Sequence, residues 1–261
     1  MKIHRIYGIV LRYLYLFRHS FDRLSDAFYW PTIDIFLWGV TSMYFRSFIP
    51  KTSLIVVALI SGLLFWIVLW RAQYEISVNL LEDLWNKNLI NIFVSPLKFS
   101  EWISSFLILG IIKASVSLPF AMLVTYFLYK IKIFFYGFYM IPFILLLLMS
   151  GWWVGFFTSG FILRFGTKVQ TLAWVLAGLI SPFSAVYYPV AVLPAWARGV
   201  ASFMPTSYVF EGMREVLYSG KLNMNKLIIS FILNAIYLTI SIIFLRKSFN
   251  KVLEKGLVKL Y

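Results

Sequence analysis

Long runs without a charged residue recur along this chain, and they restrict it to folds that a lipid bilayer can hold. Residues 52–70 contain no Asp, Glu, Lys, Arg or His. A membrane-spanning helix needs about 20 mostly apolar residues in succession, so this run has the length and composition of a span. Of all residues, 61% are hydrophobic and 13% are charged, which are not the proportions of a soluble domain. We therefore predict an all-α integral membrane protein.

The other apolar runs predict five further spans, all within one transmembrane domain over residues 1–261. Six spans place both termini on one side of the membrane. Fifteen of the 24 Lys and Arg residues lie in segments on that side and eight on the other, and cytoplasmic segments carry such an excess. Both termini are therefore predicted to be cytoplasmic, in a multi-pass protein of the cytoplasmic membrane. The six spans are expected near residues 29–46, 52–70, 103–129, 136–163, 169–187 and 227–245.

Small residues recur in the fourth of these spans. Gly151, Gly155 and Ser159 stand at four-residue spacing and so share one face of a helix. Such a face allows two helix backbones to approach each other closely, which predicts tight packing there.

Residues 1–27 predict an amphipathic helix that lies in the membrane interface. Read as a helix, the segment has Lys2, Arg5, Arg12 and Arg23 near one stripe and apolar side chains around the other side. Arg12 also interrupts the apolar core that a cleavable signal peptide needs. An irregular basic tail is the alternative interpretation.

Residues 72–101 form a polar interval that we expect on the cytoplasmic side. Leucines and isoleucines in its middle offer a helical apolar face, and Pro96 stops the pattern. A short amphipathic helix is therefore predicted over residues 80–91.

Residues 188–226 form a second irregular interval, which the topology puts on the external side. Pro194 suits the first turn of a helix, and Pro205 ends the excursion that begins near Ala191. One or two short re-entrant helices are predicted here, before the last span.

Catalytic and cofactor-binding patterns are missing from the sequence. The chain has no Cys, its two histidines are His4 and His19, and its ten carboxylates are scattered. It lacks the G-x-x-x-x-G-K-[ST] loop that holds ATP phosphates and any G-x-S-x-G elbow. We expect no enzyme activity, cofactor or metal, and a membrane-embedded enzyme or assembly scaffold is a disfavoured alternative. The net charge of +14 is spread between apolar segments, which indicates contact with membrane lipids and not with nucleic acid.

Two charged residues lie within predicted spans, where a charge costs at least about 2.5 kcal/mol at a helix centre. Asp34 and Lys113 are therefore candidates for substrate contact. Alternatively, Asp34 reaches the interface from near the end of its span, and Lys113 either extends toward the interface or has a buried partner. A channel or secondary carrier that works without ATP is the alternative function, and such a carrier is expected to hold more intramembrane charges.

Two stretches resemble those of one transporter family. Residues 181–220 contain a Tyr-Pro pair at 188–189, a Leu-Pro-x-Trp step at 193–196 and a Pro-x-x-Tyr at 205–208, which Glu211 and Arg214 follow. The run EDLWNKNLINIFVSPLKFSEW, residues 82–102, is similar to a cytoplasmic connection in which an acidic helical segment precedes a Ser-Pro-Leu turn. With its six expected spans and amphipathic N-terminal helix, the chain resembles the membrane-spanning subunit of an ABC-2 type ABC transporter. It departs from the family pattern in having no glycine between Gly62 and Gly110 and in having Met204 where the family has asparagine.

The resemblance implies a transport subunit that pairs with a second copy of itself and docks a soluble ABC ATPase subunit, which binds ATP and Mg²⁺. It implies ATP-driven export, and the aromatic, apolar spans favour a lipid-linked glycan, a lipid-like molecule or a hydrophobic small molecule as substrate. The cytoplasmic interval is expected to couple the ATPase to the spans, or alternatively to cap the bundle only. The coupling candidates are Glu82, Asp83, Leu84, Trp85, Lys87 and Pro96. The candidates for the external re-entrant region or gate are Pro189, Pro194, Trp196, Pro205, Tyr208, Glu211 and Arg214.

Overall fold

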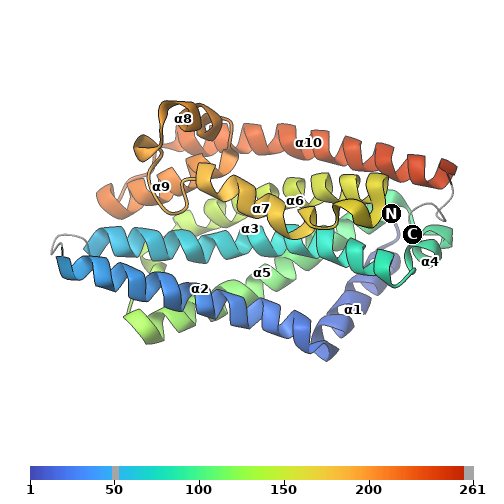
Figure 1. The fold of residues 1–261 in the computed structure, drawn as a ribbon, viewed down its shortest axis with the longest axis horizontal. Coiled ribbons are helices and arrows are strands. Elements are labelled where there is room, and N and C mark those ends of the chain that lie inside the picture. Colours follow the sequence, from blue (N-terminus) through green and yellow to red (C-terminus); the bar gives the residue numbers. More distant parts are fainter. Residues whose placement is uncertain (49–52, 256–261) are drawn as a thin grey trace.

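The computed structural model describes residues 1–48 and 53–255, and that part of the chain is a bundle of helices without strands (Figure 1). The long helices are α2 (Phe21–Phe48), α3 (Ser53–Trp85), α5 (Phe99–Tyr129), α6 (Met140–Phe165) and α10 (Met224–Lys255). The shorter ones are α1 (Ile3–His19), α4 (Leu89–Val94), α7 (Leu172–Ile180), α8 (Ala195–Ser202) and α9 (Pro205–Ser219). The 3-10 turns are η1 (Ile133–Tyr139), η2 (Gly166–Val169), η3 (Ser181–Phe183) and η4 (Val190–Val192).

The two ends of the bundle differ in the segments that they carry. Helices α1 and α4 and the last turns of α10 lie at one end, which we call the terminal end (Figure 1). Helices α8 and α9 lie at the other, the distal end (Figure 1). The long helices run between the two ends: α2 and α5 run toward the distal end, and α3, α6 and α10 run toward the terminal end (Figure 1).

Four helices of the described chain are long and apolar enough to cross a membrane. They are α3, α5, α6 with its flanking 3-10 turns, and α10, and they correspond to the spans predicted at 52–70, 103–129, 136–163 and 227–245. Residue 52 itself, like the end of the basic tail after residue 255, lies outside the described residues. The chain is therefore an all-α membrane protein, with four candidate spans among its described residues.

The spans predicted first and fifth differ from these four. Residues 29–46 lie inside α2, which runs beside α3 but is less apolar because aromatic and polar side chains interrupt its aliphatic ones (Figure 1). Residues 169–187 do not form one helix, since α7 covers nine residues and η3 follows it directly. Pro182 stands in that 3-10 turn, where its ring and missing N–H prevent the α-helix from continuing.

The central helix α3 packs closely against α6 through small residues. A Cβ atom added to Gly151 would lie 2.5 Å from the Cβ of Ala72, and one added to Gly155 would lie 2.8 Å from the Cβ of Ile76. The Ser159 hydroxyl donates a hydrogen bond to the carbonyl of Ile76 (3.4 Å). The tight packing predicted from the four-residue spacing is thus confirmed.

The N-terminal segment and the polar interval form different helices from those predicted. Residues 1–27 are not one helix, because Ser20 is extended (φ −108°, ψ 115°) and separates α1 from α2. The predicted helix at 80–91 is not a separate element: α3 continues to Trp85, and a turn with Lys87 at φ 54° precedes α4. Helix α3 continues past Trp70 because its polar residues find partners on neighbouring helices and do not need water.

Prolines begin helices at the distal end. Pro194 is the N-cap residue of α8, and Pro205 is the first residue of α9, where a missing N–H removes no helical hydrogen bond. Short helices are therefore present before the last span, as η4, α8 and α9. Pro205 starts a helix of 15 residues as well as ending the shorter one before it.

Candidate coupling site

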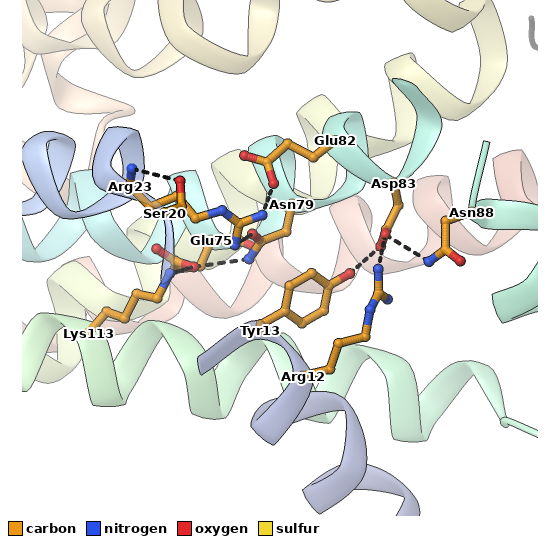
Figure 2. A network of polar contacts seen from close by, with 10 residues as sticks. All are labelled: Arg12, Tyr13, Ser20, Arg23, Glu75, Asn79, Glu82, Asp83, Asn88 and Lys113. Atoms are coloured by element: carbon orange, nitrogen blue, oxygen red, sulfur yellow. Dashed lines mark hydrogen bonds and ion pairs between the residues drawn. The ribbon is translucent and has the colours of Figure 1, made fainter. Parts of the chain in front are cut away.

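Charged side chains gather inside the bundle where α1, α2, α3 and α5 meet, toward the terminal end (Figure 2). Three of them, Glu75, Glu82 and Asp83, lie on α3, and with the amide of Asn79 they occupy relative positions i, i+4, i+7 and i+8, which share one helix face. Positive charges from α1, α2 and α5 face them (Figure 2). We call this cluster the charged network, and its members are Arg12, Tyr13, Arg23, Glu75, Asn79, Glu82, Asp83, Asn88 and Lys113.

Asp83 is the centre of one half of the network. Its carboxylate pairs with the guanidinium of Arg12 and accepts a hydrogen bond from the Tyr13 hydroxyl. It also accepts a hydrogen bond from Asn88 Nδ2 at 3.1 Å, in the turn before α4. Asp83 is 3% exposed, so these three donors replace the water that a carboxylate otherwise needs. The carboxylate therefore fastens α1 to the end of α3.

Tyr13 holds its place in this half by packing. Its side chain is 1% exposed, and its ring centroid lies 5.5 Å from that of Phe106 on α5. Burial and the nearby charge of Asp83 raise the pKa of the Tyr13 phenol well above its ordinary value. The phenol consequently stays protonated and remains a donor to Asp83.

The second half of the network joins α2, α3 and α5. Lys113 Nζ lies 2.6 Å from Glu75 Oε2, and both residues are almost completely buried. Asn79 Nδ2 donates to the same Glu75 oxygen at 3.0 Å, and Arg23 Nη1 donates to Asn79 Oδ1 at 3.1 Å. Arg23 also pairs with Glu82. A buried charge is costly when it is alone, so each of these groups depends on the others.

Lys113 was singled out as an intramembrane charge, and the structure gives it a buried partner on α3. Its Nζ also lies 4.4 Å from the ring centroid of Phe17 on α1, within the range of a cation–π contact. Extension toward the interface is therefore not needed to explain this residue. Whether Lys113 contacts a substrate stays a prediction.

A further contact fastens the start of α1 to the start of α5. Glu101 accepts hydrogen bonds from the backbone N–H groups of Lys2 (2.6 Å) and Lys98 (3.0 Å). Arg5 Nη1 lies 3.5 Å from Glu101 Oε2, and Arg5 also donates to the carbonyl of Pro96. Arg5, Arg12 and Arg23 of the predicted basic stripe thus each pair with a carboxylate of the bundle.

The sequence-based coupling candidates divide into inward and outward residues. Asp83 and Leu84 are buried, and Glu82 pairs with Arg23. Trp85 is 48% exposed, and Lys87 and Pro96 are exposed as well. The outward residues surround the turn at the end of α3, whereas the inward ones belong to the network or the core.

Trp85 forms one surface with the segment after α6. Its Nε1 donates to Gln170 Oε1 at 3.2 Å, and its ring stacks on Trp174 with centroids 6.0 Å apart. On the other side of the turn, a cavity of about 390 Å³ separates α1 from α4, with Arg5, Arg12 and Asn91 in its lining. The terminal end therefore offers an aromatic surface next to a basic, hollow one.

The distal candidates lie together around α9. Glu211 Oε1 accepts a hydrogen bond from the N–H of Val190 (2.8 Å), directly after Pro189. Arg214 Nη2 donates to the carbonyl of Val186 (3.1 Å), and its Nη1 lies 3.6 Å from Glu211. These bonds fix the loop before α8 onto α9.

The remaining distal candidates serve the same small helices. The Tyr208 hydroxyl donates to the carbonyl of Ser202 (2.9 Å), at the end of α8. Trp196 is 68% exposed, with its ring centroid 6.0 Å from that of Phe183. Trp196 is therefore the most accessible of the distal candidates' large side chains.

Asp34 lies apart from the charged network, in a cleft of about 480 Å³ between α2, α3 and α7. It is exposed and forms no ion pair with a residue of the described chain. The cleft also contains the ion pair between Arg71 Nη2 and Asp26 Oδ2 (2.6 Å). Its aromatic lining comes from Trp30, Trp38, Trp66, Trp70, Trp174 and Tyr187.

Sequence reasoning missed Glu75, Glu101, Tyr13 and Arg23 as members of these contacts. One signal could have found the carboxylates: acidic residues on one face of a helix, together with a basic stripe on a neighbouring segment. The pairing of Lys113 with Glu75 could not have been predicted from helical spacing, because the two residues are 38 positions apart and lie on different helices.

Comparison with known protein families finds a match for this chain. A family model described as ABC-2 type transporter matches residues 15–218, from the end of α1 into α9. None of the curated proteins compared with the chain matches it. The matched segment includes all of α3 and α5 and therefore every acidic member of the charged network.

Proposed function

The chain belongs to the ABC-2 type transporter family, and on that premise we propose that it is the membrane-spanning subunit of an ATP-driven exporter. Two copies pair in the cytoplasmic membrane, and each docks a separate ABC ATPase subunit that binds ATP and Mg²⁺. The family makes this chain a transport subunit, so ATP is hydrolysed on the partner. In this proposal α2 and the broken segment around α7 complete six spans, and the terminal end is cytoplasmic.

The charged network is the observation that carries the proposed coupling mechanism. Its ion pairs join α1, α2, α3 and α5 through groups that are costly to separate once they are buried. Elements joined in this way move together, as a rigid-body transition between two states requires. A displacement of the terminal end is therefore transmitted to the spans through these connected helices.

We propose that the outward residues contact the ATPase subunit and that its movement is transmitted through them. Trp85, Lys87 and Pro96 are exposed at the terminal end, and an exposed aromatic side chain is a frequent anchor of protein interfaces. Glu82 and Asp83 do not contact the ATPase in this proposal. They hold the end of α3 in place, because Glu82 pairs with Arg23 and Asp83 pairs with Arg12. Leu84 has a packing role, since it is 1% exposed in the core.

The cleft around Asp34 supports the proposed substrate classes. Tryptophan combines a large apolar face with an N–H donor, so a lining rich in this residue suits an amphipathic molecule. A lipid-linked glycan and a hydrophobic small molecule both have this character. The distal helices η4, α8 and α9 are proposed to be re-entrant and to stand at the exit of the path.

Association with the ATPase tests the proposal directly. We expect Trp85→Ala combined with Lys87→Glu to abolish co-purification with an ABC ATPase subunit that carries a Walker loop. Trp196→Ala is the matched control, because it removes an equally large exposed ring from the distal end and should leave association intact. Undiminished association of the Trp85 and Lys87 variant would contradict the docking surface, and substrate uptake by the chain without any ATPase would favour a secondary carrier.

A further inference from the structure

A second large cavity lies on the side of the bundle between α5, η1 and α6, away from the charged network. Its volume is about 800 Å³, and we call it the α5–α6 groove. On α5 its lining extends from Ile111 to Tyr126, which at the helical rise corresponds to about 22 Å. The lining is apolar apart from Ser115, Tyr126 and Lys132. Two small side chains, Ala114 and Ser115, line the groove near the end that lies away from η1.

Aromatic side chains mark the level of the groove's mouth. Phe134 and Phe138 of η1 are 77% and 90% exposed, although they are large and apolar. Phe134 lines the groove itself. Helix α5 ends directly before η1, and aromatic residues are enriched where a membrane protein meets the headgroups. The mouth of the groove is thus at the headgroup level of the distal end.

Two lysines stand at this mouth. Lys132 lines the groove, and Lys130 Nζ lies 5.3 Å from the ring centroid of Tyr126, which also lines it. Both lysines are exposed, and neither forms an ion pair with a described residue. The groove therefore combines an apolar trough with an uncompensated positive charge at the headgroup level.

We propose that the α5–α6 groove binds an anionic membrane phospholipid. One leaflet of the hydrocarbon core is about 15 Å thick, half of the bilayer core, so the trough can hold an acyl chain along its length. Water does not stably fill an apolar space of this kind, whereas the acyl chains of bilayer lipids surround the groove and can fill it. The phosphate of the headgroup lies between Lys130 and Lys132, and this charge complementarity distinguishes an anionic from a zwitterionic lipid. The site does not depend on the proposed export function.

Native mass spectrometry of the purified full chain, titrated with phosphatidylglycerol or phosphatidylcholine, tests this site. We expect tighter retention of phosphatidylglycerol, and a loss of about fivefold in its affinity for each lysine replaced in Lys130→Gln/Lys132→Gln. Lys221→Gln is the matched control, because Lys221 is also exposed at the distal end but does not line the groove. Ser115→Trp fills the trough and should lower the retention of both lipids.

Three results would overturn the proposal. Equal retention of the two lipids by the wild-type chain, or retention that the lysine variant leaves unchanged, would remove the headgroup site. A Ser115→Trp variant that keeps its lipid but loses a dimeric species would instead show that a second copy of the chain covers the groove. The lysine substitutions are on the surface, so their outcome stands even where Ser115→Trp disturbs folding.

Discussion

Lys113 carries a positive charge into a membrane-spanning helix, and Glu75 is the group that stabilises it there. The two side chains are 5% and 0% exposed, and their charged atoms are 2.6 Å apart. Removing one member of a buried pair leaves an uncompensated charge, whereas removing both leaves none. The pair is therefore expected to behave as a unit.

We expect Lys113→Met to lower the free energy of unfolding by about 3–5 kcal/mol, because Glu75 then stays buried without its cationic partner. Glu75→Gln combined with Lys113→Met should recover most of this loss, since neither member of the pair then carries a charge. A double-mutant cycle measured by chemical unfolding in detergent micelles checks both values.

Lys226 supplies the control for this cycle. It pairs with Glu215 at 3.2 Å, but both side chains are 31% exposed. Lys226→Met should cost only about 0–1 kcal/mol, as partly solvated pairs do. A Lys113→Met variant no less stable than the Lys226→Met variant would mean that the buried pair does not hold α3 and α5 together.

Local patterns in the sequence identified some residues of the site but not their partners. Lys113 stood out because it is a charge inside an apolar run, and Asp83 because it lies in an acidic segment before Pro96. Their partners Glu75 and Arg12 are 38 and 71 residues away, and no helical period connects positions so distant. Only the packing of the helices reveals that the N-terminal basic stripe faces the bundle.

The long helices illustrate which elements hydropathy can predict. Long apolar runs located α3, α5, α6 and α10, because a helix is the structure that such a run forms when it crosses a bilayer. The extension of α3 to Trp85 was not predictable in this way. Its polar turns are helical because Asp26, Arg23 and Lys113 on other elements pair with them.

Close packing of α6 on α3 has its own test. Gly151→Ala places a methyl group about 2.5 Å from Ala72, so the helices must separate, and we expect a loss of about 1–3 kcal/mol in the free energy of unfolding. Gly199→Ala in α8 is the control, because nothing lies within 4 Å of its added Cβ. Thermal unfolding of the two variants tests this expectation. Equal stability of the Gly151→Ala and Gly199→Ala variants would show that α6 can move away from α3 without loss of stability.

At the scale of the whole molecule, function depends on which end of the bundle meets which partner. The terminal end has an exposed Trp85, a basic cavity and the charged network behind them. The distal end has short helices that begin at prolines, and the exposed aromatic residues of η1. Family membership assigns a transport role to the chain, and this difference between the ends is the reason for placing the ATPase at the terminal one.

The most direct test uses the fact that the chain has no cysteine, so a single introduced cysteine reports one position only. Lys87→Cys lies in the turn after α3 at the terminal end, and Lys221→Cys lies after α9 at the distal end; both positions are exposed. Each variant is treated with a short thiol-to-amine cross-linker in membranes that also contain the ABC ATPase subunit. We expect the Lys87→Cys variant to cross-link to the ATPase, with a yield that changes on adding ATP, and the Lys221→Cys variant not to. Cross-linking from residue 221, or from neither position, would contradict the placement of the ATPase at the terminal end.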